Sequence, residues 1–480
     1  MAKNIIIIGA GAAGIAAAVK LIKNGLKNVV ILEASDRIGG RIYTTNFNNN
    51  TVDLGAQWCH GEEGNIVYDI VKDLNLLSGS EMYWNNEFLI SNGTIVPKNN
   101  SKKLEEIYYE IGINDDDIFD SDTSVGQFKI KKYNNLLKQH EYQDINDALS
   151  EQYLDWCHKF NNSIDASDNW FESSAKGSLE YHECPGHPIL NWKGAGYIRF
   201  LDVLMNKYPD PKKVLNLDIQ FKKEVISIEW NQPLSEKPVT IKCKDNSCYE
   251  ADHVIVTVPL GVLKNSSSLF KPDLPQYKMK CIENLGFGIV DKIFLRFESK
   301  WWLPDWNGIR LLWTVEDREK ENEKWLIDVF GFYTVDQCPD VLCGWVTGPS
   351  AKIMESLSDE QVLKSCSRLL RKFVARHRLR NNISYYSDPI EVLRSKWGEN
   401  PYSRGSYSLR LVRTEKYGGS SFELSKPVSD DFGRMNLLFA GEATSQNFYS
   451  TVHGAVESGF REAGRVISLN NYRPDTRSKL

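Results

Sequence analysis

The sequence lacks the features that define several classes of protein. None of its nine cysteines forms a Cys-x-x-Cys pair, and their number is odd and their spacing irregular. This pattern favours reduced thiols in an intracellular compartment over a disulfide framework. No internal repeat is evident, and apart from the opening segment no run approaches the ~20 apolar residues that span a bilayer. Basic residues are not in excess, since the net charge is −5, so a nucleic-acid-binding surface is disfavoured.

What is present is the composition of a globular protein. Hydrophobic residues make up 41% of the chain and charged residues 25%, as in soluble folded domains. A chain of 480 residues is too long for one ordinary hydrophobic core, so two domains are expected. The slightly acidic balance is compatible with a cationic small-molecule ligand but does not by itself indicate one.

Residues 4–22, NIIIIGAGAAGIAAAVKLI, allow two interpretations. One lysine, a long apolar run and several small residues resemble a secretory signal peptide. The alternative is a buried strand at residues 5–8, a glycine turn, a helix over 15–23 and a second strand at 29–32. A signal peptide would not need a second strand that ends on an acidic residue. The order of elements therefore favours a dinucleotide-binding site inside the cell.

The glycine turn carries the fingerprint Gly9-x-Gly11-x-x-Gly14. Gly9 allows the sharp turn, Gly11 lets the backbone approach a pyrophosphate, and Gly14 lets the helix pack on the strand. The helix N-terminus offers unpaired N–H groups and a partial positive charge to the phosphates. Glu33, which lies 19 residues after Gly14, is expected to accept hydrogen bonds from the adenosine ribose.

Two glycines and an arginine follow Glu33 in the segment ASDRIGGR, residues 34–41. Gly40 allows a second close backbone approach to the pyrophosphate, and Arg41 can neutralise it through charge-assisted hydrogen bonds. In isolation the segment would be interpreted as a surface turn with an incidental arginine. Beside a complete fingerprint, phosphate binding is favoured.

Five segments together resemble the FAD-dependent flavin amine oxidases, and most closely their polyamine oxidase branch. They are GAGAAG…EASDRIGGR, VDLGAQWCHG, VIVTVPLGVL, VDKIFLRF and LLFAGEATSQNFYSTVHGAVESGFREA. The matching blocks fall at residues 4–61, 254–297 and 394–467, so the resemblance reaches both ends of the chain. It implies oxidation of a secondary amine of a polyamine by FAD with oxygen as the final acceptor, giving an aldehyde, a shorter amine and hydrogen peroxide.

The resemblance implies an α/β fold class, with a Rossmann-like FAD-binding domain built from separate segments and an α+β substrate-binding domain between them. The expected FAD-binding domain comprises residues 1–80, 195–290 and 394–470, the substrate-binding domain residues 81–194 and 291–393, and a flexible tail residues 471–480.

Local patterns in the chain agree with this division. The polar stretch 80–190 predicts cap helices and loops rather than a parallel sheet, with a solvated acidic turn at 114–122. Alternation at 221–230 predicts an antiparallel strand. Alternating aromatic and polar positions at 290–350 predict an antiparallel sheet under a substrate cavity, and a helix is expected at 359–378.

The family resemblance also implies which residues contact FAD. They come from the fingerprint, the two motifs after it, a strand beside adenine, an aromatic residue at the isoalloxazine edge and the last block of the chain. These residues are Gly9, Gly11, Ala13, Gly14, Glu33, Gly40, Arg41, Gln57, Trp58, Val225, Trp397, Gly441, Glu442, Thr451 and Val452. In the last block, 437–440 predicts a buried strand, and Thr451 is expected to cap the helix that follows. Any one of 13 tryptophans is more often a core residue, and the context WGENPYSRGSY favours a cofactor contact for Trp397.

Lys292 and His60 are the candidate catalytic residues. The family's lysine at the position of Lys292 holds a water near the flavin, where burial tunes its pKa; the alternative is a lysine that covers the exposed side of a strand. His60 matches a histidine near the substrate amine, although a structural histidine is almost as well supported. The resemblance places His60, Tyr197, Ser450 and Thr451 in contact with substrate.

Two departures from the family pattern matter. Monoamine oxidases bind flavin covalently through a cysteine in the final block, whereas no cysteine lies beyond residue 366, so non-covalent FAD is expected. Ser445 stands where mammalian relatives have a histidine, so peripheral substrate contacts are expected to differ. His182, Cys184 and His187 could offer three zinc ligands, but no second cluster pairs with them and the intervening Pro-Gly indicates a turn. No metal is therefore expected.

The chain ends in Ser478-Lys479-Leu480, the peroxisomal address that an import receptor reads. A peroxisomal location is expected, or otherwise a cytoplasmic one, with no membrane or nucleic-acid partner; a monomer is compatible with the sequence. Acetylated and free spermine or spermidine are both compatible substrates. The alternatives are a dedicated spermine oxidase, a histone amine demethylase, which would carry a long heptad-patterned insertion, and a flavoprotein without enzymatic activity.

Overall fold

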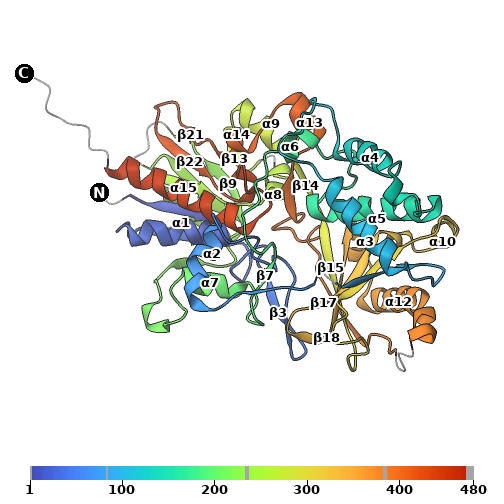
Figure 1. Cartoon of the computed structure of the whole chain (residues 1–480). Coiled ribbons are helices and arrows are strands. Elements are labelled where there is room, and N and C mark those ends of the chain that lie inside the picture. The colour runs from blue at the N-terminus through green and yellow to red at the C-terminus, as the bar shows by residue number, and fades with distance from the viewer. Residues whose placement is uncertain (1–2, 83–84, 233–236, 267, 382–385, 472–480) are drawn as a thin grey trace, which may run out of the picture.

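The computed structural model describes residues 3–82, 85–232, 237–266, 268–381 and 386–471. Two six-stranded sheets organise the chain. In Figure 1 the sheet that contains β22 lies in the left half of the molecule, and the sheet that contains β15, β17 and β18 lies in the right half. This is a mixed α/β architecture, so the predicted fold class is confirmed.

The first sheet is mainly parallel and has the order β21-β22-β12-β1-β2-β8. Its strands are β21 (Val428–Ser429), β22 (Met435–Phe439), β12 (His253–Val256), β1 (Ile5–Ile8), β2 (Val29–Leu32) and β8 (Asp218–Gln220). Only β21 is antiparallel to its neighbour. All four isoleucines of β1 are buried, as expected for a strand covered on both faces. The predicted strand, glycine turn, helix and second strand are confirmed, with α1 at Ala12–Lys23.

Two long helices pack closely against each other beside this sheet. Helix α15 (Val452–Asn471) lies along α1 in Figure 1. A Cβ atom added to Gly459 in α15 would stand 2.2 Å from the carbonyl oxygen of Ala13 in α1, so the missing side chain sets the distance between the two helices. A Cβ on Gly14 would stand 2.0 Å from the carbonyl oxygen of Gly9. The third fingerprint glycine therefore serves helix packing, as predicted.

The second sheet has the order β19-β15-β18-β17-β16-β6. Its strands are β19 (Glu391–Arg394), β15 (Val290–Arg296), β18 (Cys338–Thr347), β17 (Gly331–Val335), β16 (Gly308–Leu312) and β6 (Asn86–Ile90). Its neighbours are antiparallel except β6, which runs parallel to β16. The antiparallel sheet predicted at 290–350 is confirmed.

The stretch 80–190 differs in one respect from the prediction of helices and loops. Strand β6 extends the second sheet in a parallel pairing. Its short sequence, NEFLI, carries polar residues at the start, but Phe88 and Leu89 are buried in different hydrophobic clusters on the two faces of the sheet. A single five-residue strand among polar neighbours gives too little periodicity to be recognised.

Helices cover both faces of the second sheet. The helices of the 80–190 stretch are α3 (Lys98–Glu110), α4 (Val125–Leu136), α5 (Asp147–Asp165) and α6 (Ala175–Ser178). Aromatic residues of α5 pack against one face. The other face packs against α11 (Gly348–Ser356) and α12 (Asp359–Asn381), which confirms the helix predicted at 359–378. The acidic segment 114–122 forms turns and extended chain without a helix or strand, also as predicted.

Smaller elements complete the chain. A four-stranded sheet contains β9 (Val225–Glu229), β10 (Val239–Cys243), β11 (Cys248–Ala251) and β13 (Phe270–Lys271), and three two-stranded sheets contain β3 (Thr44–Phe47) with β4 (Asn50–Asp53), β5 (Ser78–Gly79) with β7 (Leu190–Asn191), and β14 (Gly286–Gly288) with β20 (Tyr407–Leu409). The remaining helices are α2 (Ile66–Val71), α7 (Ile198–Leu204), α8 (Leu260–Lys264), α9 (Gln276–Asn284), α10 (Val315–Lys320), α13 (Val412–Tyr417) and α14 (Ser421–Ser425). Strand β9 is antiparallel to β10, as predicted for 221–230.

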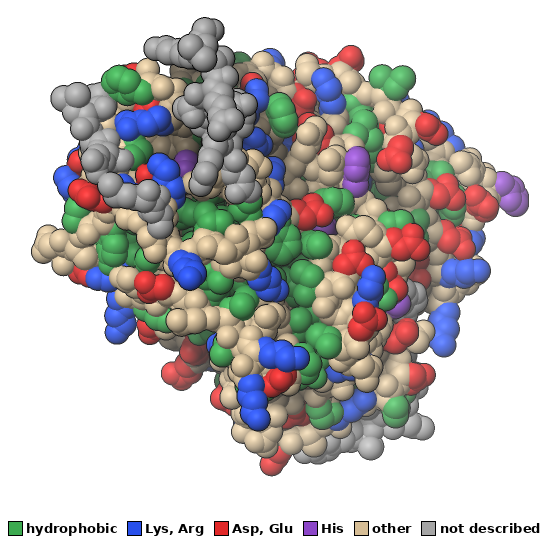
Figure 2. Space-filling view, turned by 90° about the vertical axis from the view of Figure 1, so that its left-hand side faces the viewer, with side chains coloured by type: hydrophobic (Ala, Val, Ile, Leu, Met, Phe, Trp, Pro, Cys, Tyr) green, Lys and Arg blue, Asp and Glu red, His purple; other side chains and the backbone are tan. Residues whose placement is uncertain are grey.

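The surface carries charges of both signs. On the face shown in Figure 2, acidic and basic side chains are interspersed. In the part of the chain that the structure describes, no helix combines the length and apolarity needed to cross a bilayer. The terminal Ser478-Lys479-Leu480 lies outside the described residues, and the domain boundaries expected from the sequence stay a prediction.

The contact between α1 and α15 can be tested with two glycines of one helix. Gly459→Ala forces its Cβ into the backbone of α1 and should lower the free energy of unfolding by about 1–3 kcal/mol. Gly464→Ala is the matched control, since its Cβ would meet only the flexible end of Lys20 at 3.4 Å; it should be neutral or stabilising by about 0.5–1 kcal/mol. Thermal unfolding of the two variants measures the difference. Equal midpoints would contradict this role of Gly459.

Candidate functional site

A cavity of about 780 Å³ lies between the two large sheets. Gly9, Glu33, Thr257 and Gly441, which follow the carboxyl ends of β1, β2, β12 and β22, form part of its wall. Ligands of open parallel sheets bind at these strand ends. The second sheet contributes Lys292 and other residues of β15, β17 and β18 to the same cavity. One space is therefore lined by both sheets.

The glycine turn between β1 and α1 presents bare backbone to the cavity. The N–H of Gly39 donates to the carbonyl of Ala10 at 2.8 Å, and Gly11 forms a β-bridge with Gly39. The 34–41 segment is thus held against the fingerprint, and its approach to a pyrophosphate stays a prediction. Helix α1 begins after Gly11 without a side-chain cap, which leaves its first N–H groups available to an anionic ligand.

The wall beside Gly11 fits a pyrophosphate. Gly11 lines the cavity, and a Cβ atom at this position would meet nothing closer than the carbonyl oxygen of Gly39 at 3.9 Å. Packing of the protein alone therefore does not require glycine here, whereas close approach of a ligand to the backbone does. The residues that are present fit a dinucleotide cofactor.

Glu33 lies at the end of β2, and its carboxylate accepts three hydrogen bonds from the protein, which leaves Oε2 able to accept a further one. It accepts hydrogen bonds from the N–H of Ala10 at 2.7 Å and from the N–H and hydroxyl of Ser35, both at 2.8 Å. Glu33 and Val225 of β9 both line the cavity. This placement agrees with the predicted position of the adenosine ribose.

Arg41 and Glu442 form an ion pair at the cavity wall. Nη1 of Arg41 lies 2.8 Å from Oε1 of Glu442 and donates to the carbonyl of Ser406 at 2.8 Å. The second oxygen of Glu442 accepts from the hydroxyl of Ser408 at 2.6 Å and from the N–H of Ser450 at 2.8 Å. Glu442 therefore fixes the arginine on one side and the turn before α15 on the other.

Thr451 caps α15 as predicted. Its hydroxyl oxygen accepts from the N–H of Gly454 at 3.0 Å and donates to the carbonyl of Phe448 at 2.7 Å. Ser450 has a positive φ of 67°, a conformation that serine rarely adopts. Ser450, Thr451 and Val452 all line the cavity, so the second long helix also begins at the site.

Lys292 is buried and directed at backbone carbonyls. Its ammonium lies 2.8 Å from the carbonyl oxygens of Asp53 and Gly55 and 2.7 Å from Oε1 of Gln57. Burial lowers the pKa of Lys292 to about 8, against the opposing influence of Cys343 and Asp53. The side chain therefore does not cover an exposed strand face, which was the alternative from the sequence. Its pKa lets it exchange a proton near neutral pH.

Aromatic side chains surround Lys292 within the cavity. Trp345 of β18 is its direct cross-strand partner, and such partners point to the same face of the sheet. The ring of Trp345 lies 6.2 Å from that of Trp58 and 5.6 Å from that of Tyr333, and the Lys292 ammonium lies 5.7 Å from Trp58. These residues line the cavity together with Phe330. The wall is apolar around one titratable group.

His60 lies on the same wall as Trp58. Its ring is open to the cavity, and surrounding protein atoms lower its pKa by burial, opposed by a hydrogen bond with Pro188. Nδ1 lies 3.1 Å from the carbonyl oxygen of Pro188. Because a carbonyl only accepts, Nδ1 carries the proton and Nε2 of the neutral ring is an acceptor.

Trp397 lies against the chain that follows β4. Its indole N–H donates to the carbonyl of Leu54 at 3.1 Å, and its backbone N–H donates to Asp291 at 3.1 Å. A Cβ atom on Gly55 would stand 3.0 Å from the Trp397 ring, so glycine permits this contact. Trp397 is buried yet lines the cavity, and its contact with the cofactor stays a prediction.

The structure brings almost all of the predicted site residues to the cavity wall. The two that do not line it are Gly14, which serves helix packing, and Tyr197. Tyr197 is 2% exposed and packs against Trp192 and Phe200 in a hydrophobic cluster. Its backbone N–H donates to Asp53 at 3.0 Å. The predicted substrate contact of Tyr197 is therefore wrong for this cavity, because its ring belongs to the core.

Among the cavity residues that were not predicted, three carry no signal in the sequence and a fourth, Tyr449, lies in the last family block without having been singled out. Asp165 ends α5, Tyr181 and Glu183 follow α6, and Tyr449 precedes the turn at Ser450. Burial raises the pKa of Asp165, with Lys129 opposing the shift. The first three come from the stretch 80–190, where neither a motif nor a periodic pattern marks them. These residues add carboxyl groups and aromatic rings to the cavity wall.

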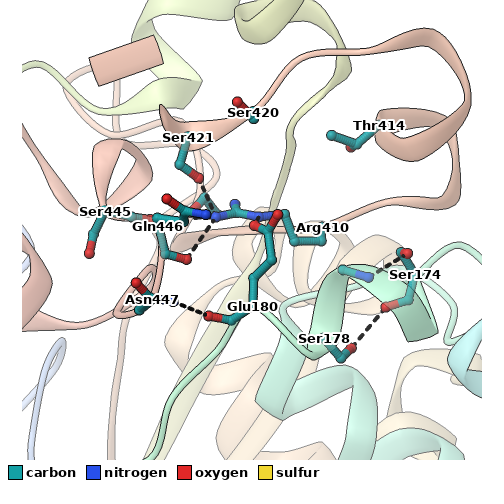
Figure 3. A network of polar contacts seen from close by, with 12 residues as sticks. Ser174, Ser178, Glu180, Arg410, Thr414, Ser420, Ser421, Ser445, Gln446 and Asn447 are labelled. Carbon is teal, nitrogen blue, oxygen red and sulfur yellow. Dashed lines mark hydrogen bonds and ion pairs between the residues drawn. The ribbon is translucent and has the colours of Figure 1, made fainter. Parts of the chain in front are cut away.

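A buried arginine, Arg410, lies between Glu180 and the segment of Ser445, Gln446 and Asn447, as Figure 3 shows. Nε of Arg410 lies 2.9 Å from Oε2 of Glu180, and Nη2 contacts the carbonyls of Ser445 and Gln446 at 3.4 Å. The guanidinium lies 4.0 Å from the Tyr449 ring centroid. Asn447 adds a hydrogen bond of 3.0 Å to the carbonyl of Glu180. Arg410 therefore fixes the segment before Tyr181 and Glu183 against the loop that carries Tyr449.

The candidate zinc ligands contact other groups. Nε2 of His182 lies 3.2 Å from Asn447, and the N–H of His187 donates to Glu62 at 3.0 Å. Among the described residues, no three His, Cys, Asp or Glu side chains are arranged to hold a metal ion. The nine cysteines are present as free thiols.

Comparison with known proteins gives a consistent result. The pattern of the family described as flavin containing amine oxidoreductase matches residues 12–467. The chain is 31% identical to a peroxisomal N(1)-acetyl-spermine/spermidine oxidase from Bos taurus, over 97% of this chain and 95% of the relative. The corresponding protein from Homo sapiens is 32% identical, with the same coverage.

A solved structure has the same fold. A double mutant of putrescine oxidase, redesigned in its cofactor binding, superposes with a TM-score of 0.68 at 19% sequence identity. The match covers 97% of this chain and 99% of the solved chain. At this identity the match shows the fold alone.

The fit of the cofactor predicts different outcomes for two fingerprint glycines. Gly11→Val should fold, since there is room for a side chain, but its side chain takes the space of the pyrophosphate and should weaken cofactor binding at least about tenfold. Gly14→Val should instead destabilise the protein, because its Cβ overlaps the Gly9 carbonyl. Circular dichroism and the ratio of visible to ultraviolet absorbance separate the two effects. A Gly11→Val protein that retains its full cofactor content would contradict the assigned role.

Proposed function

The chain belongs to the flavin containing amine oxidoreductase family, and we propose that within this family it is a polyamine oxidase. It is an FAD-dependent amine oxidase. The proposed substrates are spermine and spermidine or their N1-acetyl derivatives, oxidised at a secondary amine. The names of the bovine and human relatives support this choice.

The observation that carries the proposal is the composition of the wall around Lys292. Aromatic rings, among them Trp58, Tyr333 and Trp345, line the same cavity as the carboxyl groups of Asp165 and Glu183. Methylene segments pack well on aromatic surface, and ammonium groups are attracted by carboxylates and by the faces of the rings. A bound cation would also offset the cost of ionising the buried Asp165. A flexible chain of alternating methylenes and amines matches this wall.

The proposed reaction balances in atoms and electrons. The amine loses a hydride from the carbon beside nitrogen and a proton from nitrogen, and water hydrolyses the imine to an aldehyde and a shorter amine. When bound, FAD supplies the acceptor of the two electrons, which then pass to oxygen to give hydrogen peroxide. The residues of the chain bind and orient the amine, limit the access of water and move protons.

Lys292 and His60 are assigned to proton movement. Lys292, with its lowered pKa, is proposed to hold the water that enters the reaction and to exchange a proton with it. Because the three N–H groups of the ammonium already bind protein oxygens, it is the neutral amine that accepts a hydrogen bond from this water. His60 presents a neutral ring to the cavity, so its Nε2 is proposed to accept a hydrogen bond from the substrate amine. Ser450 and Thr451 are proposed to contact the substrate from the start of α15.

The other predicted site residues that line the cavity are proposed to hold FAD. The adenosine and pyrophosphate fit the wall formed by Gly9, Gly11, Glu33 and the 34–41 segment, and the isoalloxazine fits the wall that includes Trp397 and Lys292. Among the described residues, no cysteine lines the cavity. FAD is therefore proposed to bind without a covalent bond to the protein.

A peroxisomal location is proposed on two grounds. The sequence ends in Ser-Lys-Leu, which an import receptor recognises, and the bovine and human relatives are named as peroxisomal. A peroxide-forming oxidase also suits this compartment.

The role of Lys292 predicts a specific change in pH dependence. Because the pKa of Lys292 is about 8, the amine-oxidation rate of the protein should change near this pH as the ammonium loses its proton. Lys292→Met should lower the rate about 100-fold and abolish this transition. Steady-state kinetics from about pH 6 to about pH 10 measure both effects.

Lys264→Met is the matched control. Burial lowers the pKa of Lys264 to about 8 as well, but its ammonium binds the carbonyls of Ile282 and Glu283 and does not line the cavity. This variant should keep the transition. Loss of the transition in Lys264→Met, or its survival in Lys292→Met, would show that another group titrates.

A substrate panel tests the proposed function directly. Spermine, spermidine, their N1-acetyl forms, putrescine and benzylamine are incubated with the holoenzyme, peroxide is measured, and the aldehyde and amine products are identified by mass. At least one spermine or spermidine compound should exceed benzylamine about tenfold or more in kcat/KM. Equal turnover of benzylamine, or no peroxide from any polyamine, would refute the assignment.

A further inference from the structure

Asp291 occupies an unusual position directly before Lys292 in β15. Its side chain is fully buried and lies on the face of the sheet opposite to that of Lys292. Oδ1 accepts from the hydroxyl of Ser395 at 2.7 Å and from the backbone N–H of Trp397 at 3.1 Å. Oδ2 has no hydrogen-bond donor among the described residues. An ionised carboxylate would leave this oxygen uncompensated.

A second carboxyl group faces the first. Glu355, near the end of α11, is 2% exposed. Its Oε1 accepts from the N–H of Gly398 at 2.6 Å and its Oε2 from the N–H of Glu399 at 3.1 Å. The two carboxyl groups together therefore hold three consecutive backbone N–H groups, those of Trp397, Gly398 and Glu399.

The two groups cannot both be ionised at low cost. Burial, together with a hydrogen bond and the charge of Glu355, raises the pKa of Asp291 well above its ordinary value. Neither carboxyl group forms an ion pair within the described parts of the chain. Two like charges in a buried site favour retention of one proton, which then bridges the pair.

Other charged groups near the pair have partners of their own. Lys292 points to the cavity, and Arg394 of β19 binds Asp359 at 2.8 Å and the carbonyls of Met354 and Leu357. In the loop, Lys396 pairs with Glu399 at 3.1 Å. The residue opposite Asp291 in β18 is Val346, which carries no charge.

We propose that Asp291 and Glu355 share one proton, and that this pair is a positioning device that fixes Trp397 against the cofactor cavity. The device works through the loop, because the indole of Trp397 lines the cavity and its backbone N–H is bound to Asp291. Gly398 is required beside the pair, since a Cβ atom there would stand 2.7 Å from Oε2 of Glu355. The proposal goes beyond the proposed function and does not depend on which amine is oxidised.

Two substitutions of Asp291 separate positioning from simple burial. In Asp291→Asn, the amide oxygen can still accept from Ser395 and Trp397 and the amide nitrogen can donate to Glu355, so no proton is needed. Asp291→Leu fills similar space but loses the acceptor for Trp397. FAD dissociation constants should stay within about twofold of wild type for Asn and rise about tenfold or more for Leu. Equal weakening in both variants would overturn the proposal.

The shared proton has a direct spectroscopic signature. The infrared difference spectrum between wild-type and Asp291→Asn holoenzyme near pH 7 should contain the carbonyl band of one protonated carboxylic acid, which the variant lacks. Other carboxyl groups with a raised pKa, such as Asp165, contribute equally to both proteins and cancel. Asp252→Asn is the control, because Asp252 is a buried carboxylate paired with Lys3 and Lys237; the band should persist in it. If Asp291→Leu does not fold, Glu355→Gln serves as the second variant. The amide of the new glutamine donates to an ionised Asp291, so the carboxylic acid band must again vanish. A band that survives both amide substitutions would overturn the proposal.

Stability against pH gives an independent readout. The folded chain keeps a proton that the unfolded chain releases above its ordinary pKa near 4, so stability is full below that pH and is lost as the pH rises towards the folded pKa. The unfolding constant of wild type should therefore rise relative to that of Asp291→Asn by up to about tenfold per pH unit above pH ~5. A constant difference in thermal midpoint between the two proteins across this range would contradict the shared proton.

Discussion

The site depends on the hydrogen bonds that the ammonium of Lys292 donates. The Lys292 side chain extends from β15 of the second sheet and binds the carbonyl oxygen of Asp53, the last residue of β4, and the carbonyl oxygen of Gly55 and the side chain of Gln57 in the segment that follows. One buried cation thereby joins strand β15 of the second sheet to the chain at the end of β4, beside the cavity. Its burial lowers its pKa into the range in which protons can be exchanged. The same contact therefore builds the cavity and equips it for acid–base chemistry.

The two parts of the cavity differ in the groups that they present. The part beside the parallel sheet uses backbone, with a glycine turn, an uncapped helix start and a carboxylate at a strand end, which suits a phosphate-linked cofactor. The other part uses side chains, with aromatic rings and carboxyl groups that suit a flexible cation. Arg410 and the carboxyl pair of Asp291 and Glu355 lie behind these walls. Arg410 and the carboxyl pair bind loops of the protein rather than ligands, and so determine the positions of Tyr449 and Trp397.

The sequence predicts the backbone-built part well because glycine spacing, a short β-branched run and an acidic strand end have few structural interpretations. The strands at residues 5–8 and 29–32 and the cap at Thr451 follow from such local rules. The part built from side chains is harder to predict from the sequence, because only tertiary packing brings Asp165, Tyr181 and Glu183 to the cavity wall. Tyr197 shows the converse, since a residue that the family resemblance places at the substrate packs into the core. The pairing of Asp291 with Glu355 joins residues 64 positions apart, which no local pattern reveals.

The central claim is that one cavity holds FAD and a polyamine side by side next to Lys292. The most direct measurement mixes the purified, FAD-loaded protein with spermine or N1-acetylspermine in the absence of oxygen and follows the visible absorbance. The account predicts that the absorbance of oxidised FAD is lost at a rate that saturates with polyamine concentration, and that it returns with the release of peroxide when oxygen is admitted. A fully FAD-loaded protein that keeps its colour with every polyamine would contradict the account.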